Sequence, residues 1–288
     1  MRYLLILFTF LFSISFSQEK TGQPVGGNSN TDYLFQSLYP ASPSQEKIET
    51  SVDKPAQPIG GLADVDYVFQ SQVIYPENLL KNKVSQDVAI YFTVSSDGSV
   101  KNIEFKNEYP VEFKNEAKRL LKYFLFKPAT IGSVNVASNS FLVFKFNVDT
   151  YKKFTKARGF VIHKEQASFD TSFVIYTRAD SSPEYYKGEE ALGEFVLANL
   201  EYPDLAIRQN IQGTVVMNFI VEPNGTISNI SIEKEFNHLC TKEALRIMRE
   251  TKWKAGKKDG KLIRYKTRYP IVFNLKNTTK DNATSEQK

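Results

Sequence analysis

Hydrophobic and polar positions in the second half of the chain follow two periods, and each period predicts one kind of element. Apolar residues recur at spacings of three and four over residues 188–200, which predicts an amphipathic helix. Over residues 214–221 the two kinds of residue alternate, which predicts a strand with one face in the core. The positions on that inner face are Val215, Met217, Phe219 and Val221.

A tight turn, a second helix and a last strand complete the pattern. Asn224 and Gly225 tolerate the positive φ that hairpin turns require, so a partner strand is expected after them. The apolar stripe of Cys240, Ala244 and Met248 predicts a helix that lies on the sheet, and a final strand is expected over residues 262–275. Segregated helices packed on an antiparallel sheet make an α+β fold.

Much of this pattern occurs twice, because residues of the first half return 127 positions later. The matching positions are Tyr75-Pro76 with Tyr202-Pro203, Asp97-Gly98 with Asn224-Gly225, Glu116-Ala117 with Glu243-Ala244, and Phe126 with Trp253. An offset that holds without insertion indicates one structural unit used twice. We therefore predict two tandem modules, over residues 58–148 and 173–276, joined by an interdomain linker over residues 149–172.

The N-terminus has the pattern of a secretory signal peptide. An apolar run, Leu4–Phe16, leads to Ser15 and Ser17, the small residues expected before a cut at Gln18. The alternative is an uncleaved anchor, but thirteen helical residues cover about 20 Å of a hydrocarbon core roughly 30 Å thick. We expect residues 1–17 to be removed and the protein to be exported to the periplasm or outer envelope.

Residues 18–57 are interpreted as a flexible linker that contains a partial third repeat. Residues 24–37 echo residues 58–71, whereas residues 41–57 are rich in Ser, Pro, Glu and Lys and almost without apolar residues. A fragment of this length cannot bury a core alone, so we expect a remnant or a docking segment. Residues 277–288 are expected to form a polar tail.

The charge of the chain is mildly basic, with 37 Lys and Arg against 32 Asp and Glu, and much of the excess lies between Lys252 and Arg268. Basic residues interleaved with Trp253 and Tyr265 raise the alternative of nucleic-acid binding, which the expected export argues against. A solvated basic face that attracts acidic partners or headgroups is the preferred interpretation. Cys240 is the one cysteine, so no internal disulfide can form.

No arrangement of residues predicts catalysis, a metal site or a cofactor. The two histidines, His163 and His238, lie far apart in sequence, and we expect His238 to cap or pack near a helix start. The carboxylate pair Glu189-Glu190, and Glu112 with Glu116, fall at predicted helix starts, where acidic residues complement the helix dipole. The chain contains no nucleophile elbow, phosphate loop or dinucleotide fingerprint. We predict a protein that is not an enzyme.

The last predicted strand is the candidate functional element, because a free sheet edge can accept an extended peptide by strand addition. Pro270 within it favours an edge position. Charges on this strand have an alternative role, which is to prevent unwanted pairing, and the same edge would also allow a homodimer. The candidate partner-binding residues are Arg264, Tyr265, Lys266, Thr267, Arg268, Tyr269, Ile271 and Phe273.

Residues 183–276 resemble the C-terminal domain family of TonB, and the match is carried by short motifs that occur in the family's order. Residues 58–148 resemble a diverged copy, in which Gln86 stands at the position of Gly213 and Phe126 at that of Trp253. We expect the motif residues to be structural. They include Tyr202, Pro203, Gly213, Asn224, Gly225, Glu243, Ala244 and Trp253.

The resemblance implies that the strand over residues 264–273 binds a short peptide of an outer-membrane transporter. A full energy transducer is also expected to have an uncleaved anchor and a long Pro-rich spacer. Because we expect neither feature in this chain, we favour an exported partner-binding accessory of envelope transport. The alternative is a structural scaffold that binds peptidoglycan or a periplasmic protein without energy coupling. No cofactor and no nucleic acid is expected as a partner.

Overall fold

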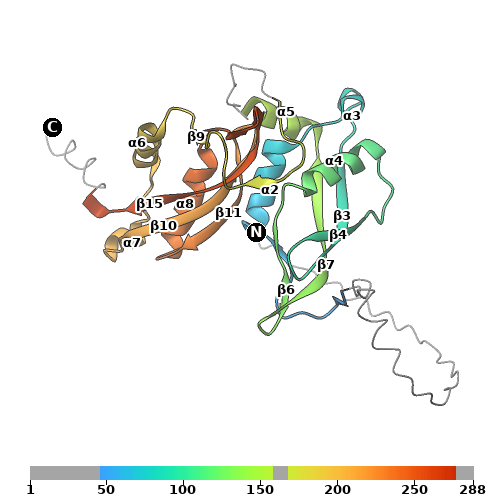
Figure 1. Cartoon of the computed structure of the whole chain (residues 1–288), viewed down its shortest axis with the longest axis horizontal. Coiled ribbons are helices and arrows are strands. Elements are labelled where there is room, and N and C mark those ends of the chain that lie inside the picture. Colours follow the sequence, from blue (N-terminus) through green and yellow to red (C-terminus); the bar gives the residue numbers. More distant parts are fainter. Residues whose placement is uncertain (1–45, 158–167, 277–288) are drawn as a thin grey trace, which may run out of the picture. The chain divides into compact units, whose positions relative to one another are not determined.

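The structure is a computed structural model that describes residues 46–157 and 168–276 (Figure 1). These residues belong to one compact unit, Glu46–Lys288. The predicted signal peptide, the partial third repeat and the polar tail lie outside the described residues, as does the middle of the predicted interdomain linker. Helices and sheets are mixed as expected, so the α+β class is confirmed.

Residues 46–157, here called the first lobe, form a sheet with the strand order β1-β7-β3-β4. Strands β3 and β7 are antiparallel, with Gln86 opposite Phe146 and Val94 opposite Ser138. The elements are β1 (Ile48–Glu49), β2 (Gln57–Pro58), α2 (Gly61–Gln72), α3 (Glu77–Lys81), β3 (Gln86–Val94), β4 (Val100–Glu104), α4 (Val111–Leu121), β5 (Phe126–Lys127), β6 (Ala129–Ile131), β7 (Val134–Phe146) and α5 (Val148–Ala157).

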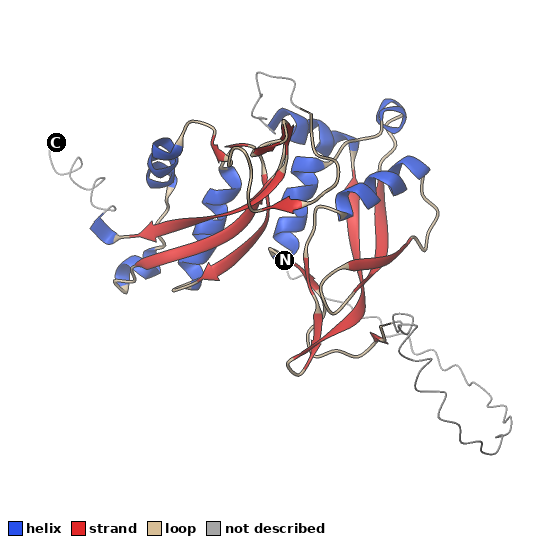
Figure 2. Cartoon of the chain, viewed as in Figure 1, coloured by secondary structure: helices blue, strands red, loops and turns tan. Residues whose placement is uncertain are grey.

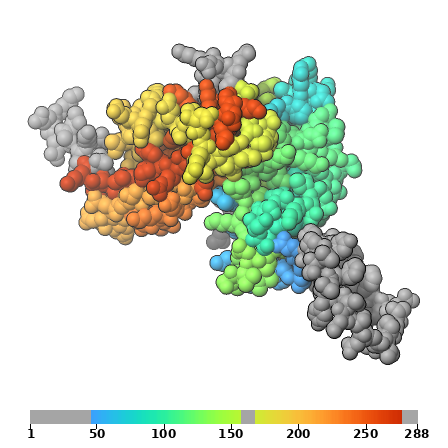
Figure 3. Space-filling view, in the orientation of Figure 1, coloured from blue at the N-terminus to red at the C-terminus, as the bar shows by residue number. Residues whose placement is uncertain are grey.

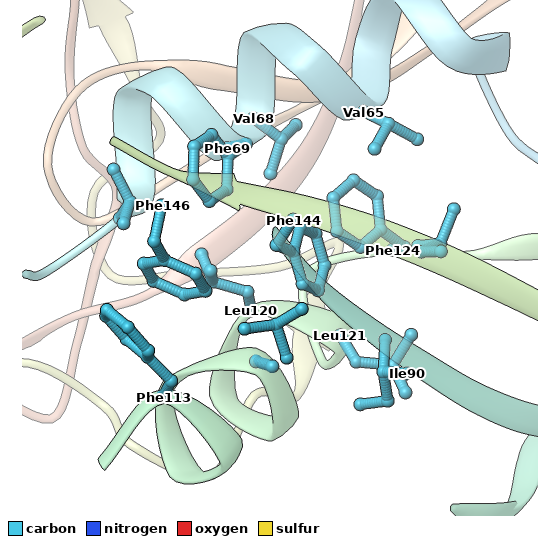
Figure 4. Packing of buried hydrophobic residues seen from close by; sticks show 14 of the residues in the cluster. Val65, Val68, Phe69, Ile90, Phe113, Leu120, Leu121, Phe124, Phe144 and Phe146 are labelled. Atoms are coloured by element: carbon cyan, nitrogen blue, oxygen red, sulfur yellow. The ribbon is translucent and has the colours of Figure 1, made fainter. Parts of the chain in front are cut away.

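The core of the first lobe lies where α2 and α4 pack on the sheet. The apolar stripe of α4, which includes Phe113 and Leu120, is fully buried. Phe113 stacks on Phe146 with ring centroids 4.4 Å apart, and Phe69 of α2 stacks on Phe144 (Figure 4). Burial of these apolar side chains, each worth about 1.5–3 kcal/mol, holds the two helices against the strands.

Residues 168–276, here called the second lobe, form a sheet with the order β11-β10-β15-β8, and Figure 2 shows its long strands side by side. The inward positions predicted for the strand over residues 214–221 are buried, Met217 and Phe219 among them. The elements are β8 (Ile175–Tyr176), β9 (Glu184–Tyr185), α6 (Glu189–Asn199), α7 (Asp204–Arg208), β10 (Gly213–Val221), β11 (Ile227–Lys234), α8 (His238–Glu250), β12 (Trp253–Lys254), β13 (Lys257–Lys258), β14 (Lys261–Leu262) and β15 (Arg264–Phe273).

Local details of the first lobe recur in the second at an offset of 127. Both bounds of α3 (77 and 81) and of α7 (204 and 208) differ by that number, as do those of β3 (86 and 94) and β10 (213 and 221). Asn102 and Asn229 both adopt the left-handed conformation, with φ of 50° and 52°. At each position the register of the antiparallel pairing shifts, as in a β-bulge, and Asn tolerates the positive φ there.

Two predicted linkers are wrong in part, because both contain regular structure. Strand β1 lies inside the stretch assigned to a flexible linker and pairs in parallel with β7, with Ile48 opposite Ala137. Backbone groups at the edge of β7 favour this pairing even for a polar segment. The last strand of the first lobe ends at Phe146, and α5 occupies the start of the predicted interdomain linker, where Tyr151 and Phe154 pack against the first core.

The sheets are therefore not purely antiparallel, since β8 repeats the parallel pairing of β1 on the second lobe. His238 lies at a helix start as expected, as the exposed first residue of α8, but it is not the residue that caps the helix. The cap of α8 is the side chain of Asn237, which accepts hydrogen bonds from the amides of Leu239 and Cys240 at 2.9 and 3.2 Å. Asparagine is among the preferred N-cap residues.

Candidate functional site

Strand β15 has an uncovered side. On one side it pairs with β10 from Tyr265 to Phe273, whereas on the other side β8 covers Arg264 and Tyr265 alone. Within residues 46–157 and 168–276, no strand pairs with residues 266–273 on the side away from β10, and we call this stretch the free edge. Unpaired amide and carbonyl groups along such an edge form a template for another strand.

The direction of the free backbone groups follows from Pro270, which lies opposite Val216 of β10. Proline has no amide hydrogen to give to a ladder, so within a strand its nitrogen faces away from the neighbouring strand. Residues two apart in a strand have the same orientation. We therefore expect Lys266, Arg268 and Val272 to direct their backbone groups outward, together with Pro270.

The predicted partner-binding residues separate into two sets. Lys266 and Arg268 are exposed on the sheet face away from the helices. Ile271 and Phe273 are each 1% exposed and pack in the core, so their side chains are not available to a partner. Thr267 and Tyr269 are partly buried. Burial raises the pKa of Tyr269, with a smaller contribution from Glu189 at the start of α6.

Arg264 is predicted to be a partner-binding residue on an exposed edge, but in the structure its side chain is buried. Its guanidinium donates to both oxygens of Glu222, at 2.8 Å from Nη2 to Oε1 and 2.9 Å from Nε to Oε2. The two side chains are 4% and 0% exposed. A buried arginine needs such a partner, and Glu222 supplies it from the end of β10. Tyr265 is half-buried, and its hydroxyl donates to the carbonyl of Thr177.

The Arg264–Glu222 pair belongs to a cluster that contacts the first lobe. Arg264 Nη2 also donates to the carbonyl of Tyr123 at 3.0 Å, and the hydroxyl of Ser228 donates to Glu222. Tyr123 packs edge-on against Phe173 at 5.1 Å, and the segment that holds Phe173 lies against the first lobe in the space-filling view (Figure 3). This cluster fixes the start of β15, upstream of the free edge.

Helix α2 of the first lobe packs against β11 of the second (Figure 1). The amide of Asn229 donates to Oδ2 of Asp64 at 2.8 Å, and Gln72 Nε2 donates to Thr226 Oγ1 at 2.8 Å. Sequence reasoning missed this contact. Its one signal was a carboxylate, Asp64, on a helix face next to apolar positions.

Asp64 is fully buried, and its Oδ1 has no hydrogen-bond partner. Burial raises the pKa of Asp64 to about 7, against the lowering effects of the Asn229 amide and the charge of Arg249. The carboxyl therefore titrates near neutral pH.

The motif residues make contacts inside the second lobe, and Asn224 also donates to Gln72 Oε1 of the first lobe at 3.1 Å. The hydroxyl of Tyr202 donates to the carbonyl of Ile211 at 2.5 Å, and Pro203 precedes α7 as its N-cap residue. Glu243 accepts from the amide of Glu201 at 2.8 Å. The remaining members include Asn224 and Gly225 at the β10–β11 turn, Ala244 in the core, and Trp253, whose Nε1 donates to Thr251 Oγ1 at 2.8 Å.

Position 213 has no room for a side chain, because a Cβ on Gly213 would lie 2.6 Å from Cγ of Phe236. We expect Gly213→Ala to lower the free energy of unfolding by about 1–3 kcal/mol through overpacking. Chemical denaturation of the wild type, Gly213→Ala, Phe236→Ala and the double variant checks this. In the double variant the cost of the added methyl group should fall to about 0.5 kcal/mol or less.

Gly193 provides the control, since a Cβ there meets nothing within 4 Å. Gly193→Ala in helix α6 is expected to raise stability by roughly 0.5–1 kcal/mol. A cost at Gly213 that persists without the Phe236 ring would contradict the packing explanation.

The first lobe has Gln86 at the position of Gly213 and Tyr109 at that of Phe236. The Tyr109 hydroxyl instead accepts from the amide of Ala89.

Other chemistry has little support in the described part of the chain. No group of three or more His, Cys, Asp or Glu residues there could hold a metal ion. In a groove of about 880 Å³ beside α8, Arg246 pairs with the carboxylates of Glu243 and Glu250. Cys240 is buried, and burial raises the pKa of its thiol. Residues 46–157 and 168–276 contain no helix long and apolar enough to cross a membrane.

Known proteins resemble the second lobe. Residues 198–275 match the family described as the Gram-negative bacterial TonB protein C-terminal domain. Two curated relatives, each named Protein TonB and each from a strain of Xanthomonas campestris pv. campestris, are 32% identical over 76 residues. The match covers 26% of this chain and 34% of each relative, so the chain spans about a third of their length.

A solved structure, the solution NMR structure of the Pseudomonas aeruginosa TonB C-terminal domain, is 20% identical and has a TM-score of 0.26. The alignment covers 37% of this chain and 97% of that one. This TM-score is too low to support an argument about the fold. The family match spans the end of α6 through β15, which includes the free edge. Residues 198–275 of this chain are thus a domain of the TonB C-terminal family.

Proposed function

We propose that this protein is a non-enzymatic, partner-binding component of the bacterial envelope that accepts an extended peptide along the free edge of β15. The observation that carries the proposal is the uncovered side of residues 266–273, in a sheet whose other strands are fixed by a buried core. Strand addition supplies main-chain hydrogen bonds, and alternate side chains provide selectivity. A TonB-type role in envelope transport is consistent with the family of residues 198–275.

The whole chain contains, in this proposal, two tandem modules of the same kind, the first diverged. Support comes from contacts that recur at the offset of 127. Arg119 binds Glu116 and the carbonyl of Gln72 in the first lobe, as Arg246 binds Glu243 and the carbonyl of Asn199 in the second. The recurrence of the same side-chain contacts at equivalent positions favours duplication of one unit.

Binding is assigned to the second module because the family match lies there, although residues 139–146 of β7 also lack a second neighbouring strand among the described residues. The corresponding side of β7 in the first lobe borders a groove of about 480 Å³ between α2 and α5, with Phe69 and Phe154 in its lining. Helix α5 follows β7 directly and packs on α2. The first module then serves to hold the second through the contacts of α2 with β11.

The signal-peptide pattern of residues 1–17 supports export to the periplasm or outer envelope, with an outer-membrane transporter peptide or another envelope protein as the partner. In this proposal the chain is an accessory of TonB-type transport rather than the proton-driven transducer. A scaffold that binds peptidoglycan is the competing outcome of the experiment below.

Photocrosslinking from single cysteines tests the proposal. Cys240 is fully buried, so a cysteine introduced at Lys266, Arg268 or Val272 can be labelled selectively with a benzophenone. After irradiation of the native envelope, the crosslinks from these three positions are expected on one partner segment, displaced along it in the order of the strand. A step of two partner residues for each two residues of β15 is the signature of strand pairing.

Phe141→Cys is the matched control, because Phe141 is 58% exposed but lies on the first sheet. Crosslinks from Phe141 that match those of the free edge would contradict strand addition at β15. Crosslinks from the edge to glycan alone, with no peptide segment in register, would instead favour the scaffold.

A further inference from the structure

We propose that the segment bound by the free edge is an acidic peptide, with carboxylate side chains opposite Lys266 and Arg268. The inference rests on the proposed function and specifies the chemistry of the partner. It follows from three features of the second sheet: the orientation of the edge, the weak pairing of its two cations, and the residues that replace them in the first lobe.

The orientation places both cations next to an added strand. Lys266 and Arg268 share the outward-facing register of Pro270, so a strand paired with the edge would lie opposite these residues. Cross-strand neighbours on one face have Cβ atoms about 4.5–5.5 Å apart, which is close enough for ion pairs. A bound residue opposite either cation would therefore contact it on the solvent-facing side of the sheet.

Neither cation has a strong partner in the second lobe. Lys266 is exposed and makes no ion pair with any residue of the described ranges. Arg268 Nη1 lies 3.4 Å from Glu233 Oε1, and the two side chains are 70% and 43% exposed. Exposed pairs of this kind contribute little, so an incoming carboxylate can replace or share Glu233 at small cost.

The first lobe shows that the fold does not need these charges. At the offset of 127, Asn139 and Phe141 of β7 stand where Lys266 and Arg268 stand in β15. Phe141 stacks on Tyr91 at 5.7 Å, and β7 pairs with β3 in the same register as β15 with β10. Because the same sheet forms with uncharged residues, the two cations point to a requirement outside folding.

Synthetic peptides can test this inference on the full mature chain. We expect an octapeptide that alternates Glu with Val to bind about five- to tenfold more tightly than one that alternates Lys with Val, measured by fluorescence anisotropy. In an alternating peptide, a register shift of two residues leaves the same type of side chain opposite Lys266. Raising the salt concentration should reduce this preference, since the pairs are exposed.

Charge reversal provides the decisive comparison. Lys266→Glu with Arg268→Glu should invert the preference between the two peptides, whereas Lys266→Asn with Arg268→Phe, the residues of the first lobe, should abolish it. Lys101→Glu with Lys145→Glu makes the same change of charge on the first sheet and should leave the preference within about twofold of the wild type.

The outcomes separate this inference from the proposed function. Equal binding of the Glu and Lys peptides, both lost when alternate peptide amides are N-methylated, would overturn the acidic-peptide inference but keep strand addition. Binding that survives N-methylation would overturn strand addition itself. Binding to anionic lipid vesicles without binding to either peptide would mean that the cations face a membrane, which also overturns the inference.

Discussion

Replacing Arg264 with alanine is expected to lower the free energy of unfolding by about 3–5 kcal/mol. The change removes one partner of a buried ion pair and leaves the carboxylate of Glu222, which is 0% exposed, without its cation. It also removes the hydrogen bond from Arg264 to the carbonyl of Tyr123, a contact between the two lobes. Urea denaturation followed by circular dichroism measures the loss.

Arg268→Ala is the matched control, since its partner Glu233 is exposed and the pair is long. Its cost should stay within about 0.5 kcal/mol. Replacing both buried partners, with Arg264→Met and Glu222→Gln, should recover part of the stability because no uncompensated charge remains. Equal losses for Arg264→Ala and Arg268→Ala would show that the Arg264–Glu222 pair does not stabilise the fold.

The wild type is expected to lose stability as the pH rises from about 4 to 7, and Asp64→Asn is expected to remove this loss. The pKa of Asp64 is raised from 3.8 to about 7 in the folded protein, chiefly by burial. Between these values the unfolded chain has lost a proton that the folded chain retains, so the free energy of unfolding falls with increasing pH. Three pKa units correspond to about 4 kcal/mol.

Urea titrations at several pH values provide the measurement, with the difference between wild type and Asp64→Asn taken at each. The difference should grow in favour of the variant up to about pH 7 and then remain constant. Asp66→Asn, on the exposed side of the same helix, is the control for the removal of one carboxylate. A profile for Asp64→Asn that parallels the wild type would mean that Asp64 is ionised in the folded protein.

Much of the fold was predictable because its signals are local. The helical stripe of α8, the alternation of β10 and the turn at Asn224 and Gly225 each depend on residues within about a dozen positions. The predicted site was only partly recoverable. Periodicity identified a final strand with charged residues, but it could not show that Arg264 is buried against the first lobe while Lys266 and Arg268 are exposed.

The two linker errors have the same origin. Polar composition predicts a flexible linker over residues 41–57, and the repeat leaves residues 149–172 as a linker between the predicted modules, yet both stretches include regular elements in the structure. Strand β1 forms because the edge of β7 offers backbone groups to a neighbouring segment, and α5 forms beside an apolar surface that Tyr151 and Phe154 can cover. Composition describes a segment alone, whereas these segments are ordered by what lies next to them.

The sequence by itself determined the α+β class, the recurrence at 127 residues, the candidate last strand and the family resemblance of the second lobe, because each is encoded in period or local motif. Only the tertiary structure decided which part of β15 is free, that Arg264 pairs with Glu222, and that Asp64 meets Asn229, 165 residues away. Such long-range contacts depend on how whole elements pack, and no short-range pattern along the chain specifies them.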